Sequence, residues 1–469
     1  PEKAGDVIGT GIIMFAVMAV AMTFAGVIFA PEIAAGLKAP RDAFNQTVSY
    51  IRVCSSGFVF IIAYNVMSGV FRGVGDSVMP LISVTIASVF NIIGDLFFVK
   101  GMGMGAKGAA IATVMAQVIS VILSMFIISK RKMPFILTKD KLRIDKSIAK
   151  RIFSLGTPLL LQDILVSISF LFLLAITNSR GVIVSAGVGI AEKLCSFIML
   201  VPSAFSQSIS AFVAQNVGAK RMDRANTALK YALVVSVCVG LVIAYVAYFH
   251  GDILCEIFSN SPEIIAAAWE YLKAYGIDTV ICSFMFCFIG YFNGRGKTVF
   301  TMAQSVISSF CIRIPMALIV SRIPGSTVFQ IGLSTPASSV LQMTMCLIYF
   351  IALKKKDIEN GFRYLYRNRE SYNRNIPMKE ALGKDDFDFY PLDIAQEKRR
   401  QDIEIARTGI EKHWIAEEHD QNGKSIFLDK RKMRIDSNDF PPILLSIEWD
   451  ITEMERMKRE LLVAKEKAE

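Results

Sequence analysis

Three aspartates lie inside long apolar segments, where an ionised carboxylate is costly and therefore suggests a function. Asp95 follows Asn91 by four residues, so on a helix both side chains share one face. Asp163 follows Gln162 directly, and Asp278 lies near the middle of its segment. Buried carboxylates can bind a cation or exchange a proton. The structural alternatives are that Asp95 reaches interfacial water near its helix end, and that Asp163 and Asp278 only hydrogen-bond neighbouring helices, for instance through Gln162.

The composition changes abruptly at about Lys356. The chain has 469 residues, of which 53% are apolar, and a net charge of +10. Before Lys356 come unbroken apolar runs, each close to the ~20 residues that span a hydrocarbon core ~30 Å thick. After Lys356 charged residues dominate. The sequence therefore predicts an all-α polytopic membrane helix bundle followed by a small α/β domain.

We expect about ten spanning segments in two pseudo-symmetric lobes, with the lipid bilayer as the surrounding partner. Their approximate limits are 7–30, 51–71, 78–99, 106–129, 153–178, 183–212, 226–249, 268–292, 298–320 and 327–353.

The basic residues predict the orientation of the chain. Lys and Arg cluster in loop 130–152, in loop 218–225 and at 354–356, and the order of segments places all three on one side. Cytoplasmic loops carry an excess of Lys and Arg, so we expect this side and the C-terminal region to be cytosolic. Membrane topology explains the positive charge better than nucleic-acid binding, and we expect no nucleic-acid partner.

The cysteines and histidines form no metal-binding pattern. The eight cysteines lie mostly in apolar segments without Cys-x-x-Cys spacing, as is typical of packing residues. We interpret the carboxylates between Glu404 and Glu418 as a solvated surface. We therefore expect no metal, no cofactor other than a coupling cation, and no enzymatic activity.

An internal repeat organises the apolar region. Tyr50-Ile51-Arg52 is followed about 20 residues later by Phe71-Arg72-Gly73-Val74-Gly75-Asp76-Ser77. Tyr271-Leu272-Lys273 is followed at the same distance by Phe292-Asn293-Gly294-Arg295-Gly296-Lys297-Thr298. Both copies keep the same order and sidedness, which predicts a parallel duplication with a substrate path between the halves. Two segments precede only the second copy, so we expect the first copy to lack two N-terminal helices.

Three landmarks occur in order along this region: Arg72-Gly73-x-Gly75-Asp76-Ser77, then Gly156-Thr157-Pro158 with Gln162, then Gln215-Asn216-x-Gly218-Ala219. With them, the chain up to about residue 355 resembles the multidrug and toxic compound extrusion (MATE) family. That family has twelve helices in two six-helix lobes, so the resemblance implies that the first two helices are missing. It also implies secondary active efflux of a small organic cationic or amphipathic substrate in the bacterial cytoplasmic membrane, driven by H+ or Na+.

The resemblance further implies a cation site in the first lobe. The family places an Asn and an Asp four residues apart on one helix and a Thr on the next, which match Asn91, Asp95 and Thr113. Carboxylate, amide and hydroxyl oxygens together suit a hard cation.

The second lobe departs from the sodium-coupled members of the family. Their additional acids are expected near Val166 and Cys282, and neither residue matches. Gln162, Asp163 and Asp278 lie close to these positions and are our candidate substrate or ion contacts.

The C-terminal region has strand signals at Phe362–Tyr366 and Ile443–Trp449 and a hairpin signal at Asn422-Gly423. Together with Leu382-Gly383-Lys384-Asp385-Asp386-Phe387-Asp388-Phe389-Tyr390 and Asp450-Ile451-Thr452, it resembles a PAS domain of the bacterial sensor-kinase type. We find no haem or flavin signature in it.

A terminal helix should follow this domain. Thr452 and Glu455 predict a capping box at its start. An apolar seam typical of a coiled coil predicts a homodimer through this helix. Its residues are Met454, Met457, Leu461, Ala464 and Ala468.

The predicted domains are a first lobe lacking two helices, a basic linker, a second lobe, a PAS-like domain and a coiled-coil helix. Their limits are 1–130, 131–152, 153–356, 357–452 and 453–469.

Two other functions stay open at this point. A membrane sensor would signal through the PAS domain to a kinase outside this chain. A flippase of lipid-linked oligosaccharides would use intramembrane cations, of which the sequence offers mainly Arg52 and Arg313. The transporter itself would be inactive if it is truncated. The junction at Lys356 is either natural or a chimera of two gene fragments.

Overall fold

The computed structural model describes residues 2–37, 40–130, 138–219, 221–361, 386–388, 390–419, 425–435 and 443–466. They form two compact units. One comprises Pro1–Ala219 with Thr227–Gln342, and the other comprises Met343–Glu469 with Lys220–Asn226.

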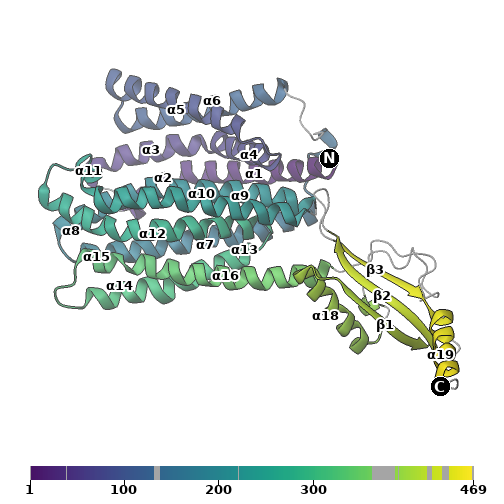
Figure 1. Cartoon of the computed structure of the whole chain (residues 1–469). Helices are drawn as coiled ribbons and strands as arrows, with labels where there is room; N and C mark the ends of the chain where they lie inside the picture. The colour runs from purple at the N-terminus through teal and green to yellow at the C-terminus, as the bar shows by residue number, and fades with distance from the viewer. Residues whose placement is uncertain are drawn as a thin grey trace. The chain divides into compact units, whose positions relative to one another are not determined.

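The first lobe of the bundle is built from six α-helices, joined by short turns (Figure 1). They are α1 (Glu2–Ile28), α2 (Ala30–Gly36), α3 (Phe44–Ser56), α4 (Phe58–Gly73), α5 (Val78–Asp95) and α6 (Gly105–Lys130), with a π-helical turn η2 (Leu96–Gly101) after α5.

The second lobe follows after a short turn (Lys139–Lys141). Its helices are α7 (Lys146–Asn178), α8 (Val182–Ile198), α9 (Leu200–Gly218), α10 (Met222–Phe249), α11 (Gly251–Glu256), α12 (Pro262–Gly294), α13 (Thr298–Ser308), α14 (Ile314–Ser321), α15 (Val328–Gly332) and α16 (Ser334–Gly361). A π-helical turn η4 (Ser309–Arg313) joins α13 to α14.

The number of spans agrees with the sequence. Among the described residues, 9 helices are long and apolar enough to cross a membrane, or up to 10 if the bent pair formed by α3 and α4 counts as one span. α8 and α9 together make one long span, Val182–Gly218, which corresponds to the segment expected at 183–212.

The helices follow a similar order in the two copies of the predicted internal repeat. α1 and α10 are each followed by a short helix, α2 or α11. α4 and α12 each end in a turn with a glycine at positive φ, Gly75 at 91° and Gly296 at 71°. The copies differ at Gly57, where α3 and α4 meet at an angle of 47° while α12 is continuous. A Cβ at Gly57 would lie 2.5 Å from a methyl carbon of Val114, so glycine allows α6 to pack against this bend.

Two of the sequence landmarks meet in space. The Gln215 side chain on α9 donates a hydrogen bond of 2.9 Å to the carbonyl of Gly73 at the end of α4. A Cβ at Gly75 would lie 3.2 Å from the same Gln215 nitrogen, and the positive φ at Gly75 also favours glycine. The hydrogen bond from Gln215 to the glycine turn after α4 therefore joins the two lobes at one end of the bundle.

The C-terminal unit contains a three-stranded antiparallel sheet in the order β1-β2-β3. Its elements are α18 (Leu392–Thr408), β1 (Lys412–His419), β2 (Ser425–Ile435), β3 (Ile443–Asp450) and α19 (Thr452–Glu466). The predicted hairpin is confirmed by the pairing of His419 with Ser425, and the predicted last strand coincides with β3. The strand predicted at Phe362–Tyr366 and the turn at Asn422-Gly423 lie outside the described residues.

The predicted capping box at the start of α19 is wrong. Glu455 donates its backbone N–H to the carbonyl of Ile451, as in a regular helix. The Thr452 hydroxyl accepts the N–H of Phe427 on β2 and donates to the Asp450 carboxylate, which also accepts the N–H of Thr452. Thr452 therefore ties α19 to the sheet, and Asp450 supplies the cap.

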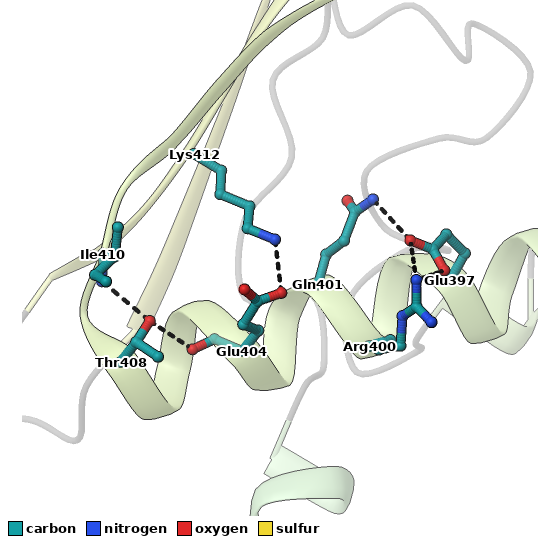
Figure 2. A network of polar contacts seen from close by, with 7 residues as sticks. All are labelled: Glu397, Arg400, Gln401, Glu404, Thr408, Ile410 and Lys412. Atoms are coloured by element: carbon teal, nitrogen blue, oxygen red, sulfur yellow. Dashed lines mark hydrogen bonds and ion pairs between the residues drawn. The ribbon is translucent and has the colours of Figure 1, made fainter.

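The carboxylates expected to form a solvated surface between Glu404 and Glu418 form ion pairs and hydrogen bonds typical of a protein surface. Glu404 of α18 forms an ion pair of 2.6 Å with Lys412. Glu397, earlier on α18, bonds to Arg400 and Gln401, and Figure 2 shows both sets of contacts. These side chains are largely exposed to solvent, and exposed pairs of this kind typically contribute about 0–1 kcal/mol. The interpretation as a solvated face fits these contacts.

Candidate functional site

Asn91 and Asp95 lie on the buried face of α5. They are half-buried, together with Gly94 and Phe98, whereas Ile92, Ile93, Leu96 and Phe97 are exposed. The Asn91 Nδ2 and Asp95 Oδ1 atoms are buried without a hydrogen-bond partner among the described residues. Buried polar groups in proteins are almost always paired, so two unpaired groups one helical turn apart are exceptional.

The polar face of α5 packs on α6, which carries Thr113 (Figure 1). The two helices approach closely, because a Cβ at Gly94 would lie 3.0 Å from the Ala112 Cβ. The Thr113 hydroxyl donates a hydrogen bond of 3.0 Å to the carbonyl of Ala109 in its own helix. Its oxygen lone pairs can still accept from, or coordinate to, another group. Whether Asn91, Asp95 and Thr113 form one site stays a prediction.

Two further side chains belong to this neighbourhood and were missed in the sequence. Gln117 lies one turn after Thr113 on α6, and its Oε1 atom is buried with no hydrogen-bond partner in the part of the chain that the structure describes. Tyr50 on α3 is within electrostatic range of Asp95. The spacing from Thr113 to Gln117 is the same four-residue interval as that from Asn91 to Asp95, so the helical period could have identified Gln117.

The second-lobe candidates are not brought together. Asp163 on α7 is exposed, whereas Asp278 on α12 has only 2% of its surface exposed. Gln162 is half-buried, and no described residue forms a hydrogen bond with its Oε1 atom. The helices that pack extensively on α12 are α8, α9 and α15 rather than α7. Among the described residues Gln162 is therefore not the hydrogen-bond partner of Asp278, and the roles of Gln162, Asp163 and Asp278 stay predictions.

Asp278 belongs instead to a polar cluster inside the second lobe. Its Oδ2 atom accepts a bond of 3.3 Å from the Cys282 thiol, and the Cys282 sulfur lies 3.9 Å from the Ser339 hydroxyl oxygen on α16. Arg313 lies close enough to interact electrostatically with Asp278. Tyr271 is fully buried, and its ring centre lies 5.3 Å from that of Tyr275, one turn further along α12.

Glu192 on α8 is a further carboxylate of this lobe that the sequence analysis missed. It is half-buried, its Oε1 atom has no hydrogen-bond partner, and its charge acts on Tyr271 and Cys195. The criterion that identified Asp163 and Asp278, a carboxylate inside an apolar segment, applies equally to Glu192.

A cleft of 540 Å³ lies between α7 and α13. None of the six candidate residues lines it. Its lining consists of Lys150, Phe153, Ser154, Thr157, Pro158, Leu161 and Met302. Thr157 and Pro158 belong to the landmark Gly156-Thr157-Pro158 of the sequence analysis. This landmark therefore lines the cleft and does not contribute to the polar sites.

Known protein families give one clear match. A family model described as MatE matches residues 1–97 and 158–319. The probable multidrug resistance protein YoeA of Bacillus subtilis is 23% identical over 373 residues, covering 76% of this chain and 79% of that protein. The multidrug export protein MepA of Staphylococcus saprophyticus is 23% identical over 329 residues, covering 69% of this chain and 72% of that protein.

Solved structures match the fold of the bundle. The crystal structure of MATE in complex with MaL6 has a TM-score of 0.69 at 19% identity and covers 75% of this chain and 85% of that chain. A MOP superfamily transporter from Pyrococcus furiosus has a TM-score of 0.68 at 20% identity and covers 76% of this chain and 79% of that chain. These matches confirm the polytopic helix bundle. They give no support to the PAS, sensor or flippase hypotheses.

Proposed function

Because this chain belongs to the MatE family, whose members are transporters rather than enzymes, we propose that it exports small organic cationic or amphipathic molecules by antiport against protons or sodium ions. The observation that carries the antiport proposal is the pair of unpaired polar atoms, Asn91 Nδ2 and Asp95 Oδ1, on one buried face of α5. Relatives whose names describe multidrug export support the choice of substrate.

The mechanism follows from the charge of Asp95. An ionised carboxylate inside a low-dielectric helix bundle is costly unless a positive charge accompanies it. A proton or a sodium ion removes that cost, and Asn91 and Thr113 add oxygen ligands that suit a metal cation. Binding therefore favours a conformation in which the first lobe closes around a neutral site, and release favours the other conformation. An ion can bias the equilibrium only through this differential affinity.

The coupling ion can be identified with the chain reconstituted in vesicles. We expect a Na+ or H+ gradient directed into the compartment that corresponds to the cytosol to drive ethidium out of that compartment. Collapse of the ion gradient should stop the movement of ethidium. A Na+ gradient at constant pH and a pH gradient in choline chloride separate the two ions. Ethidium movement that is indifferent to both gradients would contradict antiport.

The C-terminal unit is proposed to be a cytosolic PAS-like module that pairs through α19. Support comes from its antiparallel sheet and from the apolar seam of α19, in which Met454, Met457 and Leu461 are 59%, 60% and 72% exposed. An isolated helix of this length is marginal in water, so a second copy would stabilise it. The basic loops support a cytosolic position.

We expect residues 357–469, expressed alone, to be soluble and dimeric at tens of micromolar. Analytical ultracentrifugation measures the mass, and Leu461→Glu should give monomers because it places a charge in the seam. A variant with Glu460→Lys, on the neighbouring helix face, is the control and should remain dimeric. An insoluble product would contradict the independent module, and a folded monomer would contradict the dimer.

A further inference from the structure

The end of α9 contacts two equivalent glycine turns, one in each lobe. Gly73 is the last residue of α4 and Gly294 is the last residue of α12, and the predicted repeat aligns these two positions. Gly294 packs against Ser210 of α9, and Gly73 accepts a hydrogen bond from Gln215 one turn later on the same helix. The attachment of α9 to the two lobes can therefore be compared at equivalent positions.

The turn of its own lobe holds α9 through close backbone packing. A Cβ at Gly294 would lie 2.6 Å from the carbonyl oxygen of Ser210 and 2.8 Å from the Cβ of Val213, which is fully buried. The packing of α9 on α12 continues toward the middle of both helices, where a Cβ at Gly290 would meet the backbone of Ser206. Interiors packed this closely do not deform continuously. We therefore expect α9 to move with the second lobe as one body.

The turn of the first lobe holds α9 through a side chain at the surface. The Gln215 Nε2 atom donates its bond of 2.9 Å to the Gly73 carbonyl, and both residues are exposed to solvent. When such a bond opens, water replaces each partner, so its net contribution is small. The attachment of α9 to the first lobe is thus much easier to break than its attachment to the second.

A second connection between the lobes, at the end with the basic loops, is buried. The loop that leads into α7 lies on α1, where the Thr10 hydroxyl donates a bond of 3.0 Å to the carbonyl of Arg143 and accepts the N–H of Asp145 at 3.3 Å. Thr10 is 1% exposed, and a Cβ at Gly9 would collide with the carbonyl of Lys141. Asp145 also caps α7. The start of α7 is therefore firmly attached to α1.

We propose that the hydrogen bond from Gln215 to Gly73 is a latch that holds the two lobes together at the end with the basic loops. When the latch opens, the lobes rotate about the buried contact at Thr10. In transporters built from two repeats, one half rocks against the other around the substrate path. Together with the proposed export function, on which this last step rests, the closed latch blocks that path on the side expected to face the cytosol.

The distance between the two equivalent turns reports the state of the latch. In the detergent-solubilised full chain, Ser77 and Lys297, which are exposed beside these turns, are replaced by p-acetylphenylalanine and spin-labelled, so that the native cysteines stay in place. Double electron–electron resonance then gives the distance distribution. Gln215→Glu keeps the size of the side chain, but an ionised carboxylate cannot donate. We expect the population with the turns farther apart to rise about two- to tenfold relative to the latched one.

Gln215→Asn, whose shorter side chain does not reach the Gly73 carbonyl, should shift the distances in the same direction. It is measured alone if Gln215→Glu does not fold. Gln46→Glu is the matched control, because Gln46 is exposed in the first turn of α3 and should leave the distances unchanged. Distances that neither Gln215 variant changes, or that Gln46→Glu changes equally, overturn the proposal. The measurement uses no ion gradient or substrate, so a failure of antiport would defeat the proposed function and leave the latch intact.

Discussion

Replacement of Asp95 by asparagine is expected to abolish cation-driven efflux while leaving the protein in the membrane. Asparagine has nearly the same shape but cannot hold a proton or balance the charge of an ion. Bonds to a charged group contribute about 1.5–3 kcal/mol, and each 1.4 kcal/mol corresponds to about a factor of ten. We therefore expect the initial rate of ethidium efflux to fall at least about tenfold in vesicles with an imposed ion gradient.

The matched control is Asp42→Asn, which removes a carboxylate from an exposed position in the short helix before α3. It should leave the rate unchanged, because Asp42 lies outside the buried face of α5. The amount of protein in the vesicles is measured for both variants. Ethidium efflux by the Asp95→Asn variant at the rate of the parent chain would remove Asp95 from the coupling mechanism.

The parts of the fold that depend on local pattern were predictable from the sequence. The limits expected for the segment 78–99 differ by at most two residues from the span Val78–Gly101, because a hydrophobic run and the glycine turns that flank it define such a helix. The duplication was also recognisable, since Gly75 and Gly296 must both adopt positive φ. A pattern that repeats at a constant offset can be detected without any knowledge of tertiary contacts.

The break between α3 and α4 was not predicted, although the repeat was. In the first copy Gly57 accommodates a methyl carbon of Val114, and the corresponding region of the second copy is the uninterrupted helix α12. The cause is a contact with α6, more than fifty residues away in the chain. Hydropathy cannot reveal such a contact, because a bent and a straight helix of the same composition are equally apolar.

The residue types at the candidate sites could be predicted from the sequence, but the residues that contact them could not. A carboxylate inside an apolar segment is visible in the sequence, so Asp95 and Asp278 were both identified. Which groups face them depends on helix packing. Arg313 was noted as an intramembrane cation, yet its hydrogen bond to Ser169 could be seen only once η4 was placed against α7. Glu192 was missed because the segment around it is long and only moderately apolar.

A close helix approach in the second lobe depends on Gly290, and its replacement by alanine should be strongly destabilising. A Cβ at Gly290 would lie 2.3 Å from the backbone carbonyl oxygen of Ser206 on α9, far inside contact distance. Since the obstacle is backbone, α9 and α12 must move apart, and membrane helices rely on such close packing of small residues. Overpacking of this kind costs about 1–3 kcal/mol. We expect a lower Tm and less folded protein after size-exclusion chromatography in detergent.

Gly189→Ala is the matched control, because this glycine also lies within a helix, α8, and an added Cβ there would meet nothing within 4 Å. Alanine is favoured over glycine in a helix interior by about 1 kcal/mol, so this variant should be as stable as the parent chain or slightly more stable. The two substitutions are chemically identical, and only Gly290→Ala should lower the Tm. A Gly290→Ala variant that unfolds at the temperature of Gly189→Ala would show that α9 and α12 do not pack as closely as the structure indicates.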